Sequence, residues 1–490
     1  MNHRHLLLAI DLGTSGVKAG VFASDGSLVA QSGVGYETLT PHPGWAEQEP
    51  QAWWDATCRA VSQCVAQCDA TRIEGIGLTG LSPSLVCVDE RGEPVRPALI
   101  WSDRRVAQEI SELTEALGAH LSFTPLPRLL WLKRHEPNSY ERTRWVFDSF
   151  DYLSFKMTGQ AASFCPVGDQ LAWSPSDALS AGLALDKFPS RVCKLGEHVG
   201  GVLPAVAAQV GLPSGLPVIA GTIDSFAAWI GTATTRPGVV CNTVGTSDGV
   251  ALVWDQALVD PQNRLQCMPH LTGRHWIVGG AMSTGGILLE WFVRHFYNHE
   301  PDSFGTAIRE AEDVSVGADG LLALPYLVGE RSPIFDHHAR AVFFGISETH
   351  GRAHFARAVL ESVALAVRDV CHVIEEVGGA IDEIRVAGGG AKSDLWSQIK
   401  ADVVGVPVLV PQIGDSGLLG AAIIAGWGVG RFTDLSEAAE AMVKFRAVME
   451  PRVSHHEMYT KLFELYRRLY QHLKDDFVTV SQLLRPEERH

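Results

Sequence analysis

The chain has 490 residues, of which 46% are hydrophobic and 20% charged, and its formal net charge is −16. This length exceeds one ordinary core, so we expect two domains of roughly 200 to 250 residues. The apolar content is typical of globular proteins, and the acidic balance argues against nucleic acid as a partner.

The nine cysteines include no Cys-x-x-Cys pair, which favours reduced thiols over a disulfide framework or a zinc site. The first apolar run, residues 6–10, is too short for a signal peptide. No apolar stretch reaches the ~20 residues that span a bilayer. We therefore expect a cytoplasmic protein that does not associate with a membrane.

The first motif along the chain is Asp11-Leu-Gly-Thr-Ser-Gly16, which separates residues 6–10 from a second strand-like run, 17–23. This pattern predicts a strand–hairpin–strand meander. A Walker-type phosphate loop would require Gly-x-x-x-x-Gly-Lys-Ser/Thr before a helix. The nearest approach, residues 388–393, has Ala391 at a glycine position, so we reject that class of site.

The rest of the first half alternates short strands with helices. Residues 75–80 satisfy Gly-x-Gly-x-x-Gly, but Pro83 and a strand-like run follow them instead of a helix, so a dinucleotide site is not expected. The predicted strands are 73–78, 85–88 and 217–220, and the predicted helices are 53–66, 104–117 and 225–231.

The second half opens with a hairpin over residues 239–253, and its loop, Asn242-Thr-Val-Gly-Thr-Ser-Asp-Gly249, is similar to the first motif. This self-similarity suggests a duplicated domain. Loops of Gly, Thr and Ser present backbone N–H groups to anions, so two of them facing each other would hold nucleotide phosphates. Later elements are helices over 353–377, 393–403, 416–426 and 455–474, and strands over 383–386 and 408–410. Arg236-Pro-Gly238 breaks the pattern, which predicts domains 1–237 and 238–490.

Two longer motifs resemble the signatures of the FGGY family of carbohydrate kinases. Residues 123–132 resemble the first signature, with Arg128 where the family usually has Lys. The second signature matches at every defined position, and its lead-in is also typical of the family; these matches comprise 341–346, His354, Phe355, Ala358, Glu361 and 325–333. The resemblance covers nearly the whole chain.

The resemblance implies an α/β fold of two ribonuclease-H-like domains, of the actin, hexokinase and Hsp70 kind, that close over ATP and a sugar in an interdomain cleft. It also implies an ATP- and Mg²⁺-dependent kinase. A ketopentose such as xylulose, or a related polyol, is the expected substrate, and a homodimer is the default assembly.

The implied catalytic residues are two aspartates. Asp11 ends the first strand, where α/β sheets place ligands, and by resemblance it would hold Mg²⁺. Asp224 would be the base that accepts the proton of the attacking sugar hydroxyl. Phosphoryl transfer depends on alignment and charge neutralisation, so one positioned carboxylate together with Mg²⁺ suffices. The alternatives are a turn-forming Asp11 and a helix-capping Asp224.

The implied nucleotide-binding residues lie in both halves. The first loop contributes Thr14, Ser15 and Lys18, and Lys18 could equally be a solvated side chain. In the second half the matching positions are Gly245, Thr246, Gly285, Gly286, Gly389, Gly390 and Ser393. Turn chemistry and close helix packing are the alternatives for these glycines.

The implied sugar-binding residues are Leu81, Ser82, Trp101, Asp103, Asp224 and Ser225. Ser82-Pro83 replaces both the Arg-Glu pair of glycerol-specific relatives and the Met-His-Gly of xylulose-type relatives. Ser225 stands where Asn or Gln is common. For Trp101 and Asp103, a core tryptophan and a helix cap are the alternatives.

Three other functions remain open at this point. One is a kinase of another substrate class, such as a gluconate-like acid or a deoxyketose; glycerol is disfavoured. Another is a switch ATPase of the same superfamily, although such a protein needs no sugar pocket. The third is a non-catalytic sugar sensor, which the departures at Ser82, Pro83 and Ser225 favour and the intact Asp11 and Asp224 oppose.

Overall fold

The computed structural model describes residues 5–117, 124–167, 171, 173–297 and 302–483. Contacts divide the chain into two compact units, the first formed by Met1–Ala233 with Asp415–Val443 and the second by Thr234–Gly414 with Lys444–His490. The sequence predicted that the chain passes from the first domain to the second only once, after residue 237. The chain instead returns to the first unit for residues 415–443.

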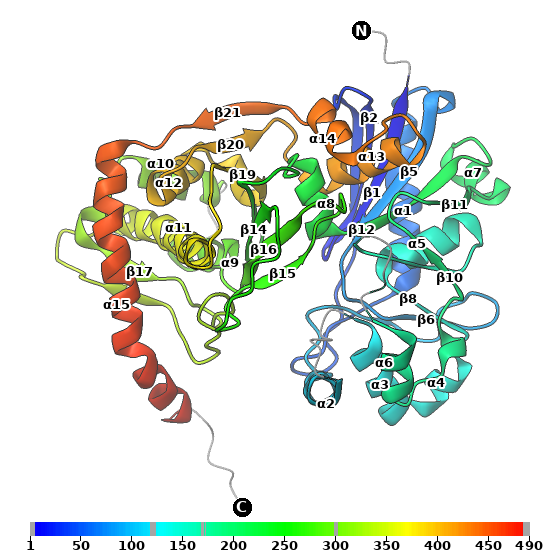
Figure 1. The fold of residues 1–490 in the computed structure, drawn as a ribbon, viewed down its shortest axis with the longest axis horizontal. Helices are drawn as coiled ribbons and strands as arrows, with labels where there is room; N and C mark the ends of the chain where they lie inside the picture. The colour runs from blue at the N-terminus through cyan, green and yellow to red at the C-terminus, as the bar shows by residue number, and fades with distance from the viewer. Residues whose placement is uncertain (1–4, 118–123, 168–170, 172, 298–301, 484–490) are drawn as a thin grey trace, which may run out of the picture. The chain divides into compact units, whose positions relative to one another are not determined.

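The first unit is built on a six-stranded mixed sheet (Figure 1). In spatial order the strands are β11 (His198–Gly201), β12 (Pro217–Ile223), β5 (Ile73–Gly80), β1 (Leu6–Leu12), β2 (Gly16–Ala23) and β3 (Leu28–Gly35). β1, β5 and β12 run parallel, whereas β2 is antiparallel to both β1 and β3. The meander predicted from residues 6–10 and 17–23 is therefore confirmed, and the strand predicted over residues 73–78 is part of β5.

Helices and three short strand pairs complete the first unit. The helices are α1 (Pro50–Val65), α2 (Ala107–Leu117), α3 (Leu126–His135), α4 (Pro137–Arg142), α5 (Ser149–Thr158), α6 (Pro175–Ser180), α7 (Pro204–Val210), α8 (Asp224–Gly231), α13 (Ser416–Gly428) and α14 (Leu435–Met442). The strand pairs are β4 (Glu47–Gln48) with β7 (Ala98–Leu99), β6 (Val86–Val88) with β8 (Trp145–Phe147), and β9 (Ala162–Phe164) with β10 (Arg191–Cys193).

Small residues explain why α13 joins the first unit, where it packs on β1, β5 and α8 (Figure 1). A Cβ at Gly77 of β5 would lie 2.0 Å from the Ala421 carbonyl oxygen, and one at Gly420 would lie 1.9 Å from that of Ala227 in α8. Side chains at these two positions would push the backbones apart. The glycines therefore set the close approach that makes α13 part of the first unit.

The second unit repeats the central arrangement of strands in a seven-stranded sheet. The strands in spatial order are β15 (Gln266–Pro269), β16 (Trp276–Met282), β14 (Asp248–Trp254), β13 (Val239–Val244), β19 (Glu383–Gly388), β20 (Val408–Pro411) and β21 (Phe445–Met449). β13, β19 and β20 are parallel, and β13, β14 and β16 form an antiparallel meander. In order and direction, β13, β19 and β20 correspond to β1, β5 and β12 of the first sheet. In the same way, β13, β14 and β16 correspond to β1, β2 and β3. This agreement confirms the predicted duplication.

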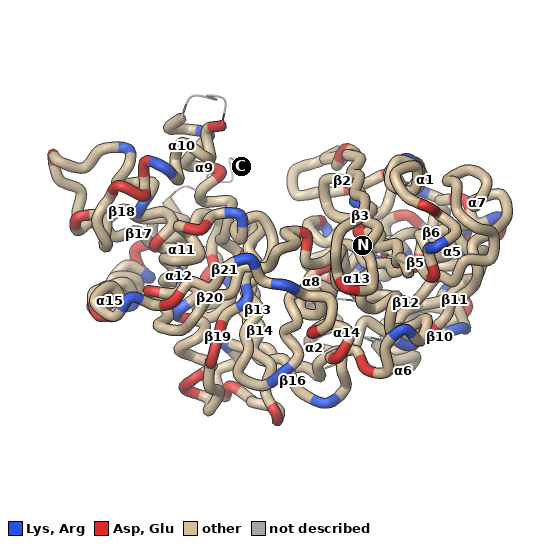
Figure 2. Tube along the Cα trace, turned by 90° about the horizontal axis from the view of Figure 1, so that it is seen from above, with Lys and Arg blue, Asp and Glu red and all other residues tan. Residues whose placement is uncertain are grey.

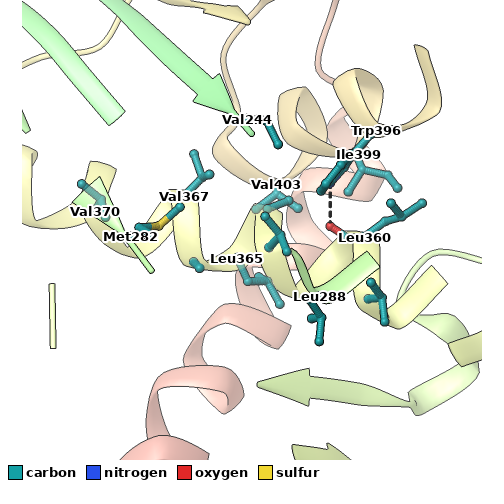
Figure 3. Close-up of a cluster of buried hydrophobic side chains, with 14 of the residues drawn as sticks. Val244, Met282, Leu288, Leu360, Leu365, Val367, Val370, Trp396, Ile399 and Val403 are labelled. Carbon is teal, nitrogen blue, oxygen red and sulfur yellow. Dashed lines mark hydrogen bonds between the residues drawn. The ribbon is translucent and has the colours of Figure 1, made fainter. Parts of the chain in front are cut away.

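The core of the second unit lies where α11 (Arg352–Glu376) packs against α12 (Asp394–Val404) and the sheet. Figure 3 shows Leu360, Val367, Trp396 and Ile399 in this cluster, and the Trp396 indole N–H donates to the Leu360 carbonyl at 3.0 Å. The other elements are α9 (Gly286–Phe296), α10 (Ser303–Glu312), β17 (Leu322–Leu324), β18 (Val342–Phe344) and α15 (Val453–Leu483). The last helix extends nine residues beyond the predicted end at 474.

The distribution of charged residues and the state of the cysteines agree with the expectations from the composition. Basic and acidic residues are interspersed along both units (Figure 2). All nine cysteines are free thiols. Among the described helices, none has the length and apolar character needed to cross a membrane.

Candidate functional site

The carboxyl ends of β1, β5 and β12 meet at one edge of the first sheet. Leu12 pairs with Gly80, and Gly80 pairs with Ile223. Side chains that follow these strand ends therefore lie close together, as is usual for ligand sites in α/β sheets. The edge carries the Asp11 loop, the Leu81–Ser82 segment and Asp224.

Asp11 is a half-buried carboxylate with incomplete hydrogen bonding. Its Oδ1 atom is buried and has no hydrogen-bond partner among the described residues. Burial raises the pKa of Asp11 to about 7, Asp224 and Asp415 act in the same direction, and Lys18 opposes them. An orphaned buried carboxylate oxygen is costly without a counter-charge, so the donor set fits a cation at this position.

Asp224 is the first residue of α8 and not its cap, which is Ile223. Its Oδ1 accepts a hydrogen bond from the Ser225 backbone N–H at 2.6 Å. Burial raises the pKa of Asp224 to about 6, the Ser225 hydrogen bond opposes this, and the charge of Asp148 adds to it. A carboxylate with this pKa is mostly ionised at neutral pH and is a stronger base than an ordinary one.

The first residues of α13 complete this group, which could not be predicted from the sequence. A Cβ at Gly417 would lie 3.4 Å from the Asp224 carbonyl oxygen and 3.7 Å from Asp11 Oδ2. Asp415, one residue before the helix, forms an ion pair with Lys18. The predicted phosphate ligand Lys18 is thus already paired with a carboxylate. The small-residue run 416–426 was visible in the sequence, but its partner was not.

The loop between β1 and β2 is held by side chains from outside it. The Tyr36 hydroxyl donates to the Gly13 carbonyl, and Gln48 Nε2 donates to the Thr14 carbonyl at 2.7 Å. The side chains of Thr14 and Ser15 are exposed. This arrangement fixes the backbone and leaves both hydroxyls accessible to a ligand.

Trp101 and Asp103 have different environments. Trp101 is 44% exposed, and its indole N–H donates to Thr14 Oγ1 at 3.1 Å. Asp103 is buried, with both oxygens occupied by the Arg105 side chain and the Ala46 backbone N–H. Trp101 therefore presents surface beside the first loop, whereas Asp103 is engaged within the protein.

The Leu81–Ser82 segment is anchored on both sides. Leu81 N–H donates to the Leu12 carbonyl at 2.8 Å, and Ser149 Oγ donates to the Leu81 carbonyl at 2.7 Å. Ser82 Oγ donates to Asp148 Oδ2 at 2.6 Å. Asp148, which the sequence did not single out, thus joins this segment to α5. Ser225 is exposed, and Phe123 of the first signature lies outside the described residues.

In the second unit, Val244 at the end of β13 pairs with Gly388 at the end of β19. This pairing brings the loop with Gly245 and Thr246 beside Gly389 and Gly390. Gly245, Thr246 and Gly389 are exposed. The two predicted nucleotide segments of this unit are therefore adjacent.

Two further predicted positions support these segments. A Cβ at Gly285 would lie 2.7 Å from the Ser247 carbonyl carbon, and one at Gly286 would lie 2.5 Å from the Gly245 carbonyl oxygen. Both glycines thus permit the loop to pack against α9. Ser393 caps α12, because its Oγ accepts from the Trp396 N–H at 3.1 Å.

A buried polar network lies beneath the second loop. Lys400 Nζ donates to Asn242 Oδ1, and Asn242 Nδ2 donates to Asp248 Oδ1 at 2.5 Å. Burial lowers the pKa of Lys400 to about 8 and raises that of Asp248 to about 6. Both groups remain mostly charged near pH 7, so Asn242 joins a buried cation to a buried anion.

The described side chains do not form a complete metal site by themselves, so a metal ion here would also need ligands from water or a bound substrate. No group of three or more His, Cys, Asp or Glu suited to a metal occurs in the described ranges. Mg²⁺ commonly uses one or two carboxylates together with water and substrate phosphates. The unpaired Oδ1 of Asp11 fits this mode of binding.

Comparison with known proteins gives matches over both units. The sequence pattern of the FGGY family of carbohydrate kinases, N-terminal domain, matches residues 6–231, and that of the C-terminal domain matches 240–429. Xylulose kinase from Bacillus subtilis is 31% identical, with 96% of this chain and 97% of that protein covered. Gluconokinase from the same organism is 26% identical, with 98% of each covered.

The fold agrees with a solved structure of the same kind. The crystal structure of xylulose kinase from Rhodospirillum rubrum has a TM-score of 0.82, is 28% identical, and covers 96% of this chain and 100% of its own. The expected pair of ribonuclease-H-like domains is confirmed.

Proposed function

Because the chain belongs to the FGGY family of carbohydrate kinases, we propose that it transfers the γ-phosphoryl group of ATP to a hydroxyl of a ketopentose such as xylulose. The observation that carries this proposal is the pair of half-buried carboxylates, Asp11 and Asp224, whose pKa values are both raised, at one edge of the first sheet. The names of two relatives, both xylulose kinases, favour xylulose within the family. ATP and sugar phosphates are cytoplasmic metabolites, so we place the enzyme there.

In this mechanism Asp224 accepts the proton of the attacking hydroxyl. Its Oδ1 is fixed by the Ser225 N–H, which leaves Oδ2 to receive the proton. Its ionised form dominates at neutral pH, and its pKa of about 6 strengthens it as a proton acceptor. The remaining barrier reduction comes from alignment and from neutralisation of phosphate charge.

Asp11 would hold Mg²⁺ through its unpaired Oδ1. When bound, the ion would neutralise phosphate charge and lower the barrier to transfer. Lys18, paired with Asp415 in the free enzyme, would reach phosphate only by exchanging this partner. Thr14 and Ser15 offer exposed hydroxyls on the same loop.

We assign nucleotide binding in the second unit to Gly245, Thr246, Gly389, Gly390 and Ser393. Glycine at 389 and 390 lets a ligand approach the backbone closely. Gly285 and Gly286 contribute to nucleotide binding indirectly, because they let the loop with Gly245 pack against α9.

The first test is ADP release under Mg²⁺-ATP across ketopentoses, polyols, gluconate and glycerol. We expect one ketopentose to raise turnover far above the rate without sugar. Turnover that no sugar changes would favour a switch ATPase. A gluconate-specific rate would favour the second candidate, which the 26% identical gluconokinase supports.

The pH dependence of kcat/KM for the sugar reports the ionisation of Asp224. The group must be ionised to act, so activity is lost when pH falls through its pKa of about 6. We expect a plateau above roughly pH 7 and about a tenfold fall per pH unit below 6. The measurement is kcat/KM at saturating Mg²⁺-ATP, with stability checked at each pH. A fall centred near the ordinary aspartate value of about 4 would contradict the assignment.

A further inference from the structure

Asp148 lines a small cavity beside the proposed base. The cavity has a volume of about 50 Å³, and its walls include Ser82, Asp148, Phe164 and Ile223. Ile223 immediately precedes Asp224, and the charge of Asp148 raises the pKa of Asp224. Asp148 and the proposed base, Asp224, therefore lie close to the same small cavity of the first unit.

The two oxygens of Asp148 are used unequally. Oδ1 accepts from Ser84 N–H at 3.0 Å, Ser84 Oγ at 2.5 Å and Ser149 N–H at 2.8 Å. Among the described residues, Oδ2 accepts only from Ser82 Oγ, at 2.6 Å. A carboxylate oxygen has two acceptor positions, so Oδ2 retains one. Asp148 itself is partly exposed, whereas Ser84 is completely buried.

The surroundings of Asp148 disfavour a second anion. Burial raises the pKa of Asp148, and the hydrogen bonds from Ser82, Ser84 and Ser149 oppose this rise. Arg128 is buried and interacts electrostatically with Asp148; burial lowers its pKa to about 10, so it stays protonated. Arg128 does not line the cavity, and none of the described lining residues is basic. Asp151 is a further lining carboxyl group. A negatively charged substrate group would meet repulsion here without a partner.

We infer that Asp148 is a specificity-determining residue, whose Oδ2 accepts a hydrogen bond from a hydroxyl of the acceptor substrate. It thereby selects an uncharged polyhydroxy substrate, such as a ketose, over a sugar acid. The inference rests on the proposed kinase function and narrows its substrate class. It also gives Ser82 a role: its hydroxyl orients the carboxylate that contacts the sugar.

The test compares Asp148→Asn with Asp434→Asn. Asp434 caps α14 by accepting from the N–H groups of Ser436 and Glu437 and does not line the cavity, so it controls for loss of a capping charge. Asp148→Asn is expected to raise KM for the preferred ketose by about 10- to 100-fold, the usual range for one hydrogen bond to a charged group. KM for ATP should not change.

The same variant should relax specificity. The ratio of kcat/KM for gluconate to that for the ketose is expected to rise by about tenfold or more, because one repelling charge is removed. Ser82→Ala, which keeps the charge, should raise KM for the ketose by about 3- to 10-fold without this change in ratio. It also provides a second variant if Asp148→Asn does not fold.

The outcomes separate the two proposals. An active wild-type enzyme whose ketose KM and gluconate ratio are the same in Asp148→Asn would overturn this inference and leave the kinase function standing. If Asp148→Asn does not fold, an unchanged ketose KM in Ser82→Ala would overturn it. Wild-type preference for gluconate would also overturn it. No turnover with any compound would overturn both.

Discussion

Replacing Asp224 with asparagine is expected to lower kcat for the sugar by about 10²- to 10⁴-fold, the usual contribution of a positioned base. Asparagine keeps the shape and can still accept the Ser225 N–H through its amide oxygen. It cannot take up a proton. KM for ATP should change little, because nucleotide binding is assigned to other residues.

The measurement is coupled ADP release with the sugar that the wild type prefers, together with the melting temperature. Asp55→Asn, which changes an exposed aspartate on α1 of the same unit, is the matched control. The pH profile adds a second readout, because the fall of activity below pH ~6 should disappear in Asp224→Asn. A variant that retains most of the wild-type kcat would show that another group is the base.

Replacing Lys400 with methionine is expected to lower the free energy of unfolding of the second unit by about 3–5 kcal/mol. The ammonium group is buried and bound to Asn242, and its loss leaves the buried charge of Asp248 without compensation. Within the described part of the chain, one oxygen of Asp248 already lacks a hydrogen-bond partner. The cost arises from this stranded charge more than from a lost contact.

Urea unfolding measures the effect, with Lys461→Met on the exposed side of α15 as control. The decisive variant is Lys400→Met combined with Asp248→Ala, which removes both charges and should recover most of the loss. Because Asn242 and Asp248 flank the loop with Gly245 and Thr246, Lys400→Met should also raise KM for ATP. A loss below about 1 kcal/mol would mean that Asp248 is neutral in the folded protein.

Several features of this protein followed from sequence alone. The two Gly-Thr-Ser loops lie between antiparallel strands as predicted, because alternating apolar residues and turn residues determine local hairpins. The periodic run that became α11 was also clear, since its apolar positions recur on one helical face. The family signatures indicated the kinase class and, through it, Asp11 and Asp224.

The tertiary structure decided which distant segments meet. The sequence showed α13 as a small-residue helix, but only packing against Gly77 and Ala227 places it in the first unit, with Gly417 beside Asp11 and Asp224. In the same way Asp148 reads locally as a helix cap, and it becomes a candidate sugar ligand only because Ser82 and Ser84 bind it. Local propensity depends on neighbouring residues, whereas these contacts join residues that are far apart in the chain. Such contacts depend on backbone spacing and on the burial of charge, which no short stretch of sequence encodes.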